Sequence, residues 1–214
     1  LFYALWVPDL FMQRVEDDED WTLMSEHECP GLSDNYGENF NKLYKKYEKE
    51  LPHLEKIKAR ALMSKIIEAQ IETGQPYMLY KDAVNKKSNQ KNIGVIKSSN
   101  LCAEIVEYSD KNQTAVCNLA SIALPKFVDK NNKDYDYKAL YKTAKLATKN
   151  LDRVIDINFY PTKKTDTSNN LHRPIGLGIQ GLSDVFFKMS IAHDGKKAAE
   201  INIKIFETIY FGAL

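Results

Sequence analysis

Residues 135–157 read YDYKALYKTAKLATKNLDRVIDI and carry the strongest helical pattern in the chain. The apolar residues of this stretch recur with a broadly helical period, as one face of a helix requires. They are Leu140, Ala144, Leu146, Ala147, Leu151, Val154 and Ile155. Short apolar runs that suit strands lie before and after this predicted helix. Because short strands alternate with longer helices along most of the chain, the sequence predicts an α/β fold.

The other elements are predicted from helical spacing or from short apolar runs. The predicted helices are residues 1–16, with a kink or restart at Pro8, and residues 39–50, 56–72, 180–189 and 196–214. The predicted strands are residues 21–24, 77–80, 100–108, 115–120 and 175–177, with 100–108 and 115–120 joined as a hairpin. Residues 81–92 and 161–170 are predicted to be loops. These strands are too few to close a barrel alone.

The composition excludes several classes of protein. With 214 residues, of which 43% are hydrophobic, the chain can form one domain with a real core. A formal net charge of +1 does not indicate a nucleic-acid partner. We expect no signal peptide, and the sequence shows no apolar run of membrane-spanning length, so we expect no membrane partner and a cytoplasmic location.

The cysteines do not form a recognisable structural framework. Cys29, Cys102 and Cys117 are an odd and sparse set, which is typical of a reducing compartment. The chain has no C-x-x-C pair, so we expect no metal site. The chain opens in the apolar segment Leu1–Val7 and closes in another, Ile209–Leu214. Domains seldom end on such segments, and we therefore expect residues 1–214 to be a single segment of a longer chain.

The candidate site is the stretch Asn100-Leu101-Cys102-Ala103-Glu104. In an extended strand, residues two apart point the same way, so an amide, a thiol and a carboxylate would share one face. A second thiol, Cys117, follows fifteen residues later. A carboxylate beside a thiol opposes the thiolate because like charges repel. The set therefore suits a cysteine that reacts as a radical, with the carboxylate as base and the second thiol as reductant.

Two other interpretations stay open on the residues alone. Gly176-Leu177-Gly178-Ile179-Gln180-Gly181 matches G-x-G-x-x-G, which would make the chain a dinucleotide-binding oxidoreductase. The same glycines also suit close backbone packing where a strand turns into a helix. Alternatively, the chain is a non-catalytic helical interaction module whose cysteines are core residues.

Five blocks of sequence resemble one family. They are Ser99–Ile105, Ala115–Ser121, Leu1–Met12, Glu72–Asp82 and His172–Leu182, and they cover the chain from end to end. Together they are similar to the large catalytic subunit of class I ribonucleotide reductase, of the eukaryotic type. The resemblance implies that residues 1–214 are part of the family's ten-stranded α/β barrel and include its central finger loop. It assigns the glycine motif to that barrel.

The resemblance implies reduction of ribonucleoside 5′-diphosphates to their 2′-deoxy forms by thiyl-radical chemistry. Cys102 matches the radical cysteine, which takes hydrogen from the ribose 3′ carbon and later returns it. Glu104 matches the carboxylate base for the 3′-hydroxyl proton, and Asn100 matches the amide that holds the substrate hydroxyl groups. We therefore expect Asn100 and Glu104 to bind substrate. Cys117 matches one of two thiols that end as a disulfide.

The resemblance also implies partners and absent parts. A separate small subunit supplies the radical from its metal cofactor, and thioredoxin or glutaredoxin reduces the disulfide. The large subunit forms a homodimer, and ATP and deoxynucleotide effectors bind it elsewhere, so we expect no cofactor on this segment. The regulatory N-terminal lobe, the upstream half of the barrel and the C-terminal tail are missing from residues 1–214. We therefore expect the segment alone to be inactive.

Overall fold

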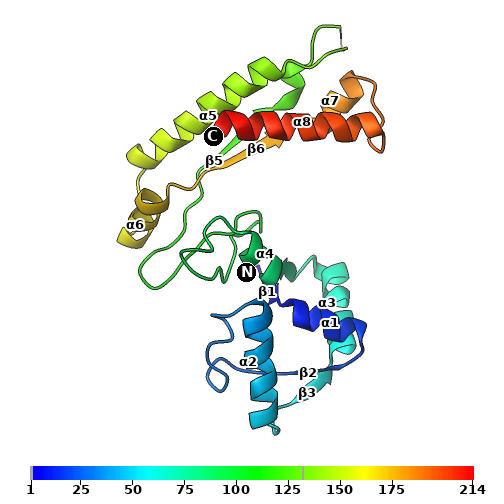
Figure 1. The fold of residues 1–214 in the computed structure, drawn as a ribbon, viewed down its shortest axis with the longest axis vertical. Coiled ribbons are helices and arrows are strands. Elements are labelled where there is room, and N and C mark those ends of the chain that lie inside the picture. The colour runs from blue at the N-terminus through cyan, green and yellow to red at the C-terminus, as the bar shows by residue number, and fades with distance from the viewer. Residues whose placement is uncertain (1, 132) are drawn as a thin grey trace. The chain divides into compact units, whose positions relative to one another are not determined.

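The computed structural model describes residues 2–131 and 133–214, which fall into two compact units (Figure 1). Unit 1 ends at Lys111, and unit 2 begins at Asn112. Leu1, the first residue of the first predicted helix, lies outside the described residues, as does Asn132. Each unit combines helices with short strands, so the predicted α/β class is confirmed.

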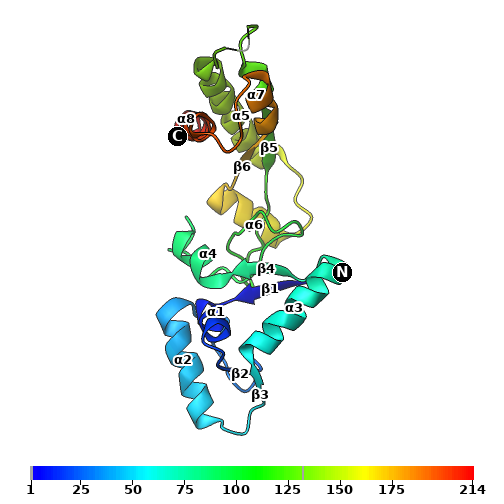
Figure 2. The ribbon, with the colours of Figure 1, turned by 90° about the vertical axis from the view of Figure 1, so that its right-hand side faces the viewer.

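Unit 1 contains two small sheets covered by helices (Figure 2). In chain order its elements are β1 (Ala4–Val7), α1 (Asp9–Glu16), β2 (Asp20–Thr22), α2 (Gly37–Glu50), β3 (Lys56–Lys58), α3 (Ala59–Thr73), β4 (Tyr77–Tyr80) and α4 (Lys81–Lys87). Strand β1 pairs in parallel with β4, and β2 pairs antiparallel with β3. Buried Val7, Phe11 and Ala59 pack together and join β1 to α1 and α3.

Unit 2 is built on one parallel pair of strands. Its elements are β5 (Leu119–Ala123), the 3₁₀ turn η1 (Leu124–Phe127), α5 (Tyr137–Ile157), α6 (Lys163–His172), β6 (Gly176–Gln180), α7 (Leu182–Lys188) and α8 (Lys196–Ala213). The register of β5 against β6 runs from Leu119 opposite Gly176 to Ala123 opposite Gln180. Helices α5 and α8 lie side by side (Figures 1 and 2), with Leu140, Ala144 and Ile205 fully buried in the core.

The elements with strong local patterns lie where the sequence predicts them. Helix α5 covers most of residues 135–157, α2 covers 39–50, and α8 and α7 fall within the last two predicted helices. Strand β4 has the predicted bounds, and β6 extends the predicted strand by three residues, to Gln180. In these segments the apolar period and the packing agree, so local sequence determines the element.

Three predictions for unit 1 are wrong. Residues 4–7 form strand β1, not a helix, because aromatic and β-branched side chains there pair with β4. Residues 56–58 form β3 before α3 begins. Residues 81–87 form helix α4, not a loop. The helix is polar because its buried residues, Lys81, Asp82 and Asn85, bind neighbouring segments instead of packing in an apolar core.

Two further predictions are wrong. Residues 163–172 form α6, which begins with a capping box between Thr162 and Thr165. The predicted hairpin is absent, because residues 100–108 contain no strand and β5 pairs with β6. The described residues form three two-stranded sheets and no closed barrel, as the small number of strands predicts. None of the helices they form is both long and apolar enough to span a bilayer.

Candidate functional site

Asn100, Cys102 and Glu104 lie on one loop of unit 1. Residues 101–103 make a turn, and Ala103 at its end adopts a φ of +64° in the left-handed region. The thiol-bearing Cys102 and the carboxylate-bearing Glu104 are exposed, whereas Asn100 is half-buried. The carboxylate of Glu104 has no hydrogen bond or ion pair within the part of the chain that the structure describes. The loop therefore presents a thiol and an uncommitted acceptor group to solvent.

The loop is closed at its neck, the point where Ser99 and Asn100 before the turn contact Ile105 after it. The Ser99 hydroxyl donates to the carbonyl oxygen of Ile105 at 2.5 Å, and the Ile105 amide donates to Oδ1 of Asn100 at 2.9 Å. Within the loop, the Ala103 amide donates to the carbonyl oxygen of Asn100 at 3.1 Å. The strand prediction for this stretch is wrong. Hydrogen bonds across the neck, not alternation along a strand, bring the three candidate residues onto one loop.

Helix α4 and the turn after it hold the two arms of the loop. Asn85, almost fully buried, binds Ile96 twice: Nδ2 donates to the Ile96 carbonyl at 3.0 Å, and Oδ1 accepts the Ile96 amide at 2.7 Å. The returning arm is held at Tyr108, whose amide donates to Oε1 of Gln90 at 2.7 Å. Side-chain amides thus replace a β-ladder as the support for this loop.

The start of α4 is anchored in unit 1 by a buried lysine. The ammonium group of Lys81 donates to the carbonyl oxygen of Leu32 at 2.7 Å and lies 4.6 Å from the centroid of the Phe40 ring. Burial lowers the pKa of Lys81 to about 8. These contacts fix the helix from which Asn85 reaches the loop.

Glu107 is a second carboxylate close to the loop in sequence. It is half-buried, and its Oε2 has no hydrogen-bond partner among the described residues. Burial raises the pKa of Glu107 to about 7. A carboxyl group with this environment changes its charge near neutral pH, unlike an ordinary surface glutamate.

Cys117 lies in unit 2, two residues before β5, and is half-buried. The backbone next to it is held by several contacts. Nδ2 of Asn118 donates to the Pro174 carbonyl at 3.0 Å, and the Asn118 carbonyl accepts the Gly176 amide at 2.8 Å. Further upstream, Nε2 of His172 lies 2.6 Å from Oε1 of Gln113. The segment around Cys117 is therefore hydrogen-bonded to residues 172–176, which lead into β6.

The glycine motif serves packing. Gly176 and Gly178 lie inside β6, whereas a dinucleotide fingerprint places its glycines in the turn after a strand. Gly181, with φ of +77°, begins α7, and a Cβ built on it would lie 2.7 Å from the ring of Pro125. Close approach between η1 and the strand-to-helix turn explains this glycine, in line with the packing interpretation of the motif.

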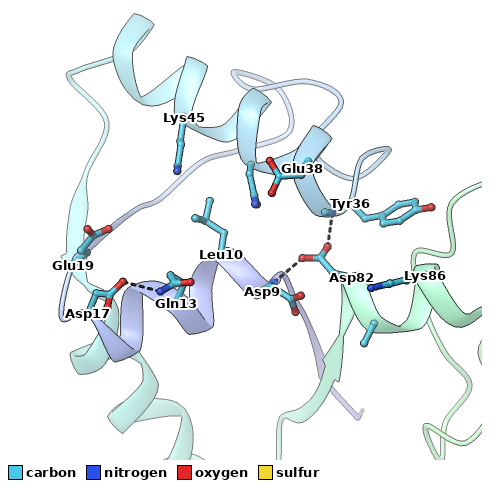
Figure 3. Close-up of a pocket in the computed structure, with 13 residues that line it drawn as sticks. Asp9, Leu10, Gln13, Asp17, Glu19, Tyr36, Glu38, Lys45, Asp82 and Lys86 are labelled. Carbon is cyan, nitrogen blue, oxygen red and sulfur yellow. Dashed lines mark hydrogen bonds between the residues drawn. The ribbon is translucent and has the colours of Figure 1, made fainter.

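A cavity of about 770 Å³ lies elsewhere in unit 1, between α1, α2 and α4 (Figure 3). Asp82 closes one end: its carboxylate accepts the amides of Asp9 and Gly37, both at 2.8 Å, and so caps the starts of α1 and α2. Burial, and then repulsion from Asp82, raises the pKa of Asp9. The predicted site residues are not among those that line this cavity.

Sequence reasoning misses the residues that support the loop. Ser99, Asn85 and Gln90 bind backbone atoms of residues 6, 11 and 18 positions away, and the sequence around these polar side chains gives no sign of such distant partners. A weak signal is available at Ser99 and Asn100, because serine and asparagine side chains often bond to nearby backbone groups.

The chain is similar to known proteins along its whole length. The family model for the ribonucleotide reductase barrel domain matches residues 1–214. The chain is 56% identical over its 214 residues to the ribonucleoside-diphosphate reductase large chain of Neurospora crassa and covers 23% of it. It is 55% identical to the large subunit from Plasmodium falciparum and 54% identical to that from Danio rerio, covering 27% of each. The chain therefore spans about a quarter of the length of these curated relatives.

Proposed function

The chain belongs to the ribonucleotide reductase barrel-domain family, and from this we propose that it carries part of the catalytic centre of a ribonucleoside-diphosphate reductase large subunit. The reaction replaces the 2′-hydroxyl group of a ribonucleoside 5′-diphosphate by hydrogen. The observation that carries the proposal is the closed loop of unit 1, which holds a thiol, a carboxylate and an amide together and leaves the thiol exposed.

In the proposed reaction Cys102 acts as a thiyl radical. It takes the hydrogen atom from the 3′ carbon of the ribose, and the same atom returns to that carbon at the end. Glu104 accepts the proton of the 3′-hydroxyl group, a role that suits its uncommitted carboxylate. Positioned base catalysis of this kind typically contributes about 10²–10⁴-fold to the rate. The Oδ1 atom of Asn100 is occupied by Ile105, so Asn100 offers its N–H donors to the ribose oxygens.

Cys117 is proposed as one of two thiols that supply the reducing equivalents. The pair loses two electrons and two protons and becomes a disulfide. The substrate gains a hydrogen at its 2′ carbon and loses its hydroxyl group as water. The second thiol belongs to a part of the subunit outside residues 1–214, and a thioredoxin- or glutaredoxin-type dithiol restores the pair by exchange.

The radical is proposed to come from a small subunit that carries a metal cofactor, since protein side chains do not generate such a radical unaided. A large-subunit homodimer is the proposed assembly. ATP and deoxynucleotide effectors are proposed to bind outside this segment, and the enzyme is proposed to work in the cytoplasm. Because residues 1–214 span about a quarter of the relatives, we expect the isolated segment to be inactive.

The proposal is tested with Cys102→Ser in the full-length subunit, assayed with small subunit, ribonucleoside diphosphate and a dithiol reductant. Deoxynucleotide formation should fall to background, while the dissociation constant for the nucleotide stays within about threefold, because serine cannot form the radical but keeps the size of the side chain. The matched control is Cys29→Ala, which removes a buried thiol outside the loop and should keep turnover. Turnover by Cys102→Ser, or an equal loss in both variants, contradicts the proposal.

A further inference from the structure

We infer that Ser99 is a positioning residue, whose hydroxyl group closes the neck of the loop and thereby sets the place of the Cys102 sulfur. The inference rests on the function proposed for this loop. Ser99 touches neither reacting atoms nor substrate in this role, and it acts through Ile105 and Asn100. Without its bond to Ile105, Ser99 would be an ordinary half-buried polar residue.

The distances at the neck single out the hydroxyl group. Two donors share the carbonyl oxygen of Ile105: the Ser99 hydroxyl at 2.5 Å and the backbone N–H of Asn100 at 3.4 Å. The second distance is beyond the usual range for an N–H···O bond, so the hydroxyl is the stronger contact. Ser99 Oγ also lies 3.3 Å from Oδ1 of Asn100. Removing the hydroxyl leaves the carbonyl with the long backbone contact alone.

The conformation of the tip requires such a closure. Ala103 has φ of +64°, a region that costs an L-residue about 1–2 kcal/mol, and a strained residue of this kind persists only where its surroundings determine it. The other two supports lie further from the tip, at Ile96 on one arm and Tyr108 on the other. Of the three supports, the pairing of Ser99 and Asn100 with Ile105 is the one nearest to Cys102.

The same closure prepares Asn100 for substrate. Its Oδ1 is directed to the Ile105 amide at 2.9 Å, which leaves Nδ2 as the group for other partners. Ser99 therefore influences two of the three candidate residues at once, the radical cysteine through the tip and the substrate amide through the neck. Transfer of a hydrogen atom depends steeply on geometry, and a displacement of about 1 Å can cost about 100-fold in rate.

The test uses Ser99→Ala, Ser99→Thr and Ser98→Ala in the full-length subunit, assayed with its small subunit. Ser99→Ala should lower kcat by about 100-fold and leave the dissociation constant of the ribonucleoside diphosphate within about twofold. Ser99→Thr keeps the hydroxyl and should restore at least about a third of wild-type kcat. Ser98→Ala removes an exposed neighbouring hydroxyl and should match wild type.

A second measurement does not need turnover. Hydrogen–deuterium exchange of the peptide covering residues 99–106 should become about tenfold faster in Ser99→Ala and stay near wild type in Ser99→Thr and Ser98→Ala. Unchanged exchange in Ser99→Ala overturns the inference, as does faster exchange with kcat within twofold of wild type. If the wild-type subunit makes no deoxynucleotide, the proposed function fails, and the exchange experiment still decides whether Ser99 closes the loop.

Discussion

The two cysteines proposed to act in the reaction are supported in different ways. Cys102 lies on a loop without β-pairing, and side chains hold that loop at Ile96, Ile105 and Tyr108. Cys117 lies just before β5, whose backbone is held along its length by β6. In the first region the supports at Ile96 and Tyr108 each depend on one side chain, and the support at Ile105 depends on two, so a single substitution can remove or weaken a support. In the second region several backbone hydrogen bonds hold the segment, so no single side chain determines the position of the Cys117 thiol.

The largest expected effect separates the chemical roles of the two thiols. Cys117→Ser in the full-length subunit should allow at most one aberrant turnover per active site, because the variant cannot form the disulfide that completes the reaction. Rapid-quench measurement of product per subunit, with a dithiol protein as reductant, checks this. Normal multiple turnover by Cys117→Ser would falsify the role proposed for Cys117, and Cys29→Ala again serves as the control.

The next effect compares the supports themselves. Asn85→Leu removes both hydrogen bonds to Ile96 and leaves the buried backbone N–H and carbonyl of Ile96 without partners. Each such group costs about 1–3 kcal/mol, so opening of the loop region should become easier by about 3 kcal/mol. Hydrogen–deuterium exchange of residues 96–108 in the full-length subunit measures this change.

The matched change in the other region is Asn118→Leu. It removes one hydrogen bond, from Nδ2 to Pro174, while the backbone bond from Gly176 and the β5–β6 ladder remain. Exchange of residues 113–123 should therefore indicate a loss of about 1 kcal/mol. An effect of Asn118→Leu equal to that of Asn85→Leu would show that the two regions do not differ in how support is distributed.

The contrast also explains what the sequence can predict. Helix α5 and strand β4 follow from apolar spacing, because local pattern and packing agree there. Helices α4 and α6 have no such pattern: Asn85 and Asn169 are buried as hydrogen-bonding residues, and their partners are distant along the chain or belong to a neighbouring turn. Strand β1 also depends on a distant partner, β4.

The candidate site shows the same division. Asn100, Cys102 and Glu104 do share one loop, whereas alternation along the sequence places them on a strand, because that is the simplest way to align residues two apart. The turn at residues 101–103 and the left-handed Ala103 depend on contacts of Ser99 and Asn100 with Ile105. Those contacts are set by geometry across the neck, which a linear pattern does not encode.

A smaller effect concerns the buried carboxyl group near the loop. The pKa of Glu107 is raised to about 7, from 4.5 for an ordinary glutamate, because burial disfavours its charged form. The folded state therefore holds a proton that the unfolded state loses. The contribution of Glu107 to the free energy of unfolding of unit 1 should be greatest below pH 4.5. It should be lost as the pH rises through about 7.

Glu107→Gln tests this dependence. The variant should match wild type near pH 4 and be more stable by about 1 kcal/mol at pH 8, a value reduced from the full shift because the group is partly exposed. Both tryptophans, Trp6 and Trp21, lie in unit 1, so urea unfolding of the 214-residue chain followed by tryptophan fluorescence reports on this unit. A pH profile unchanged by the substitution contradicts the raised pKa.

The smallest effect is expected at the tip of the loop. Ala103→Gly relieves the left-handed strain, worth about 1 kcal/mol, but glycine also loses about as much by gaining freedom in the unfolded chain. The melting temperature should therefore change by less than about 2 °C. The neck stays closed through Ser99, so kcat should fall by no more than about threefold. Ala103→Val, with a branched side chain in the same backbone region, should be clearly worse. A loss of kcat in Ala103→Gly as large as that expected for Ser99→Ala would mean that the tip, and not the neck, sets the position of Cys102.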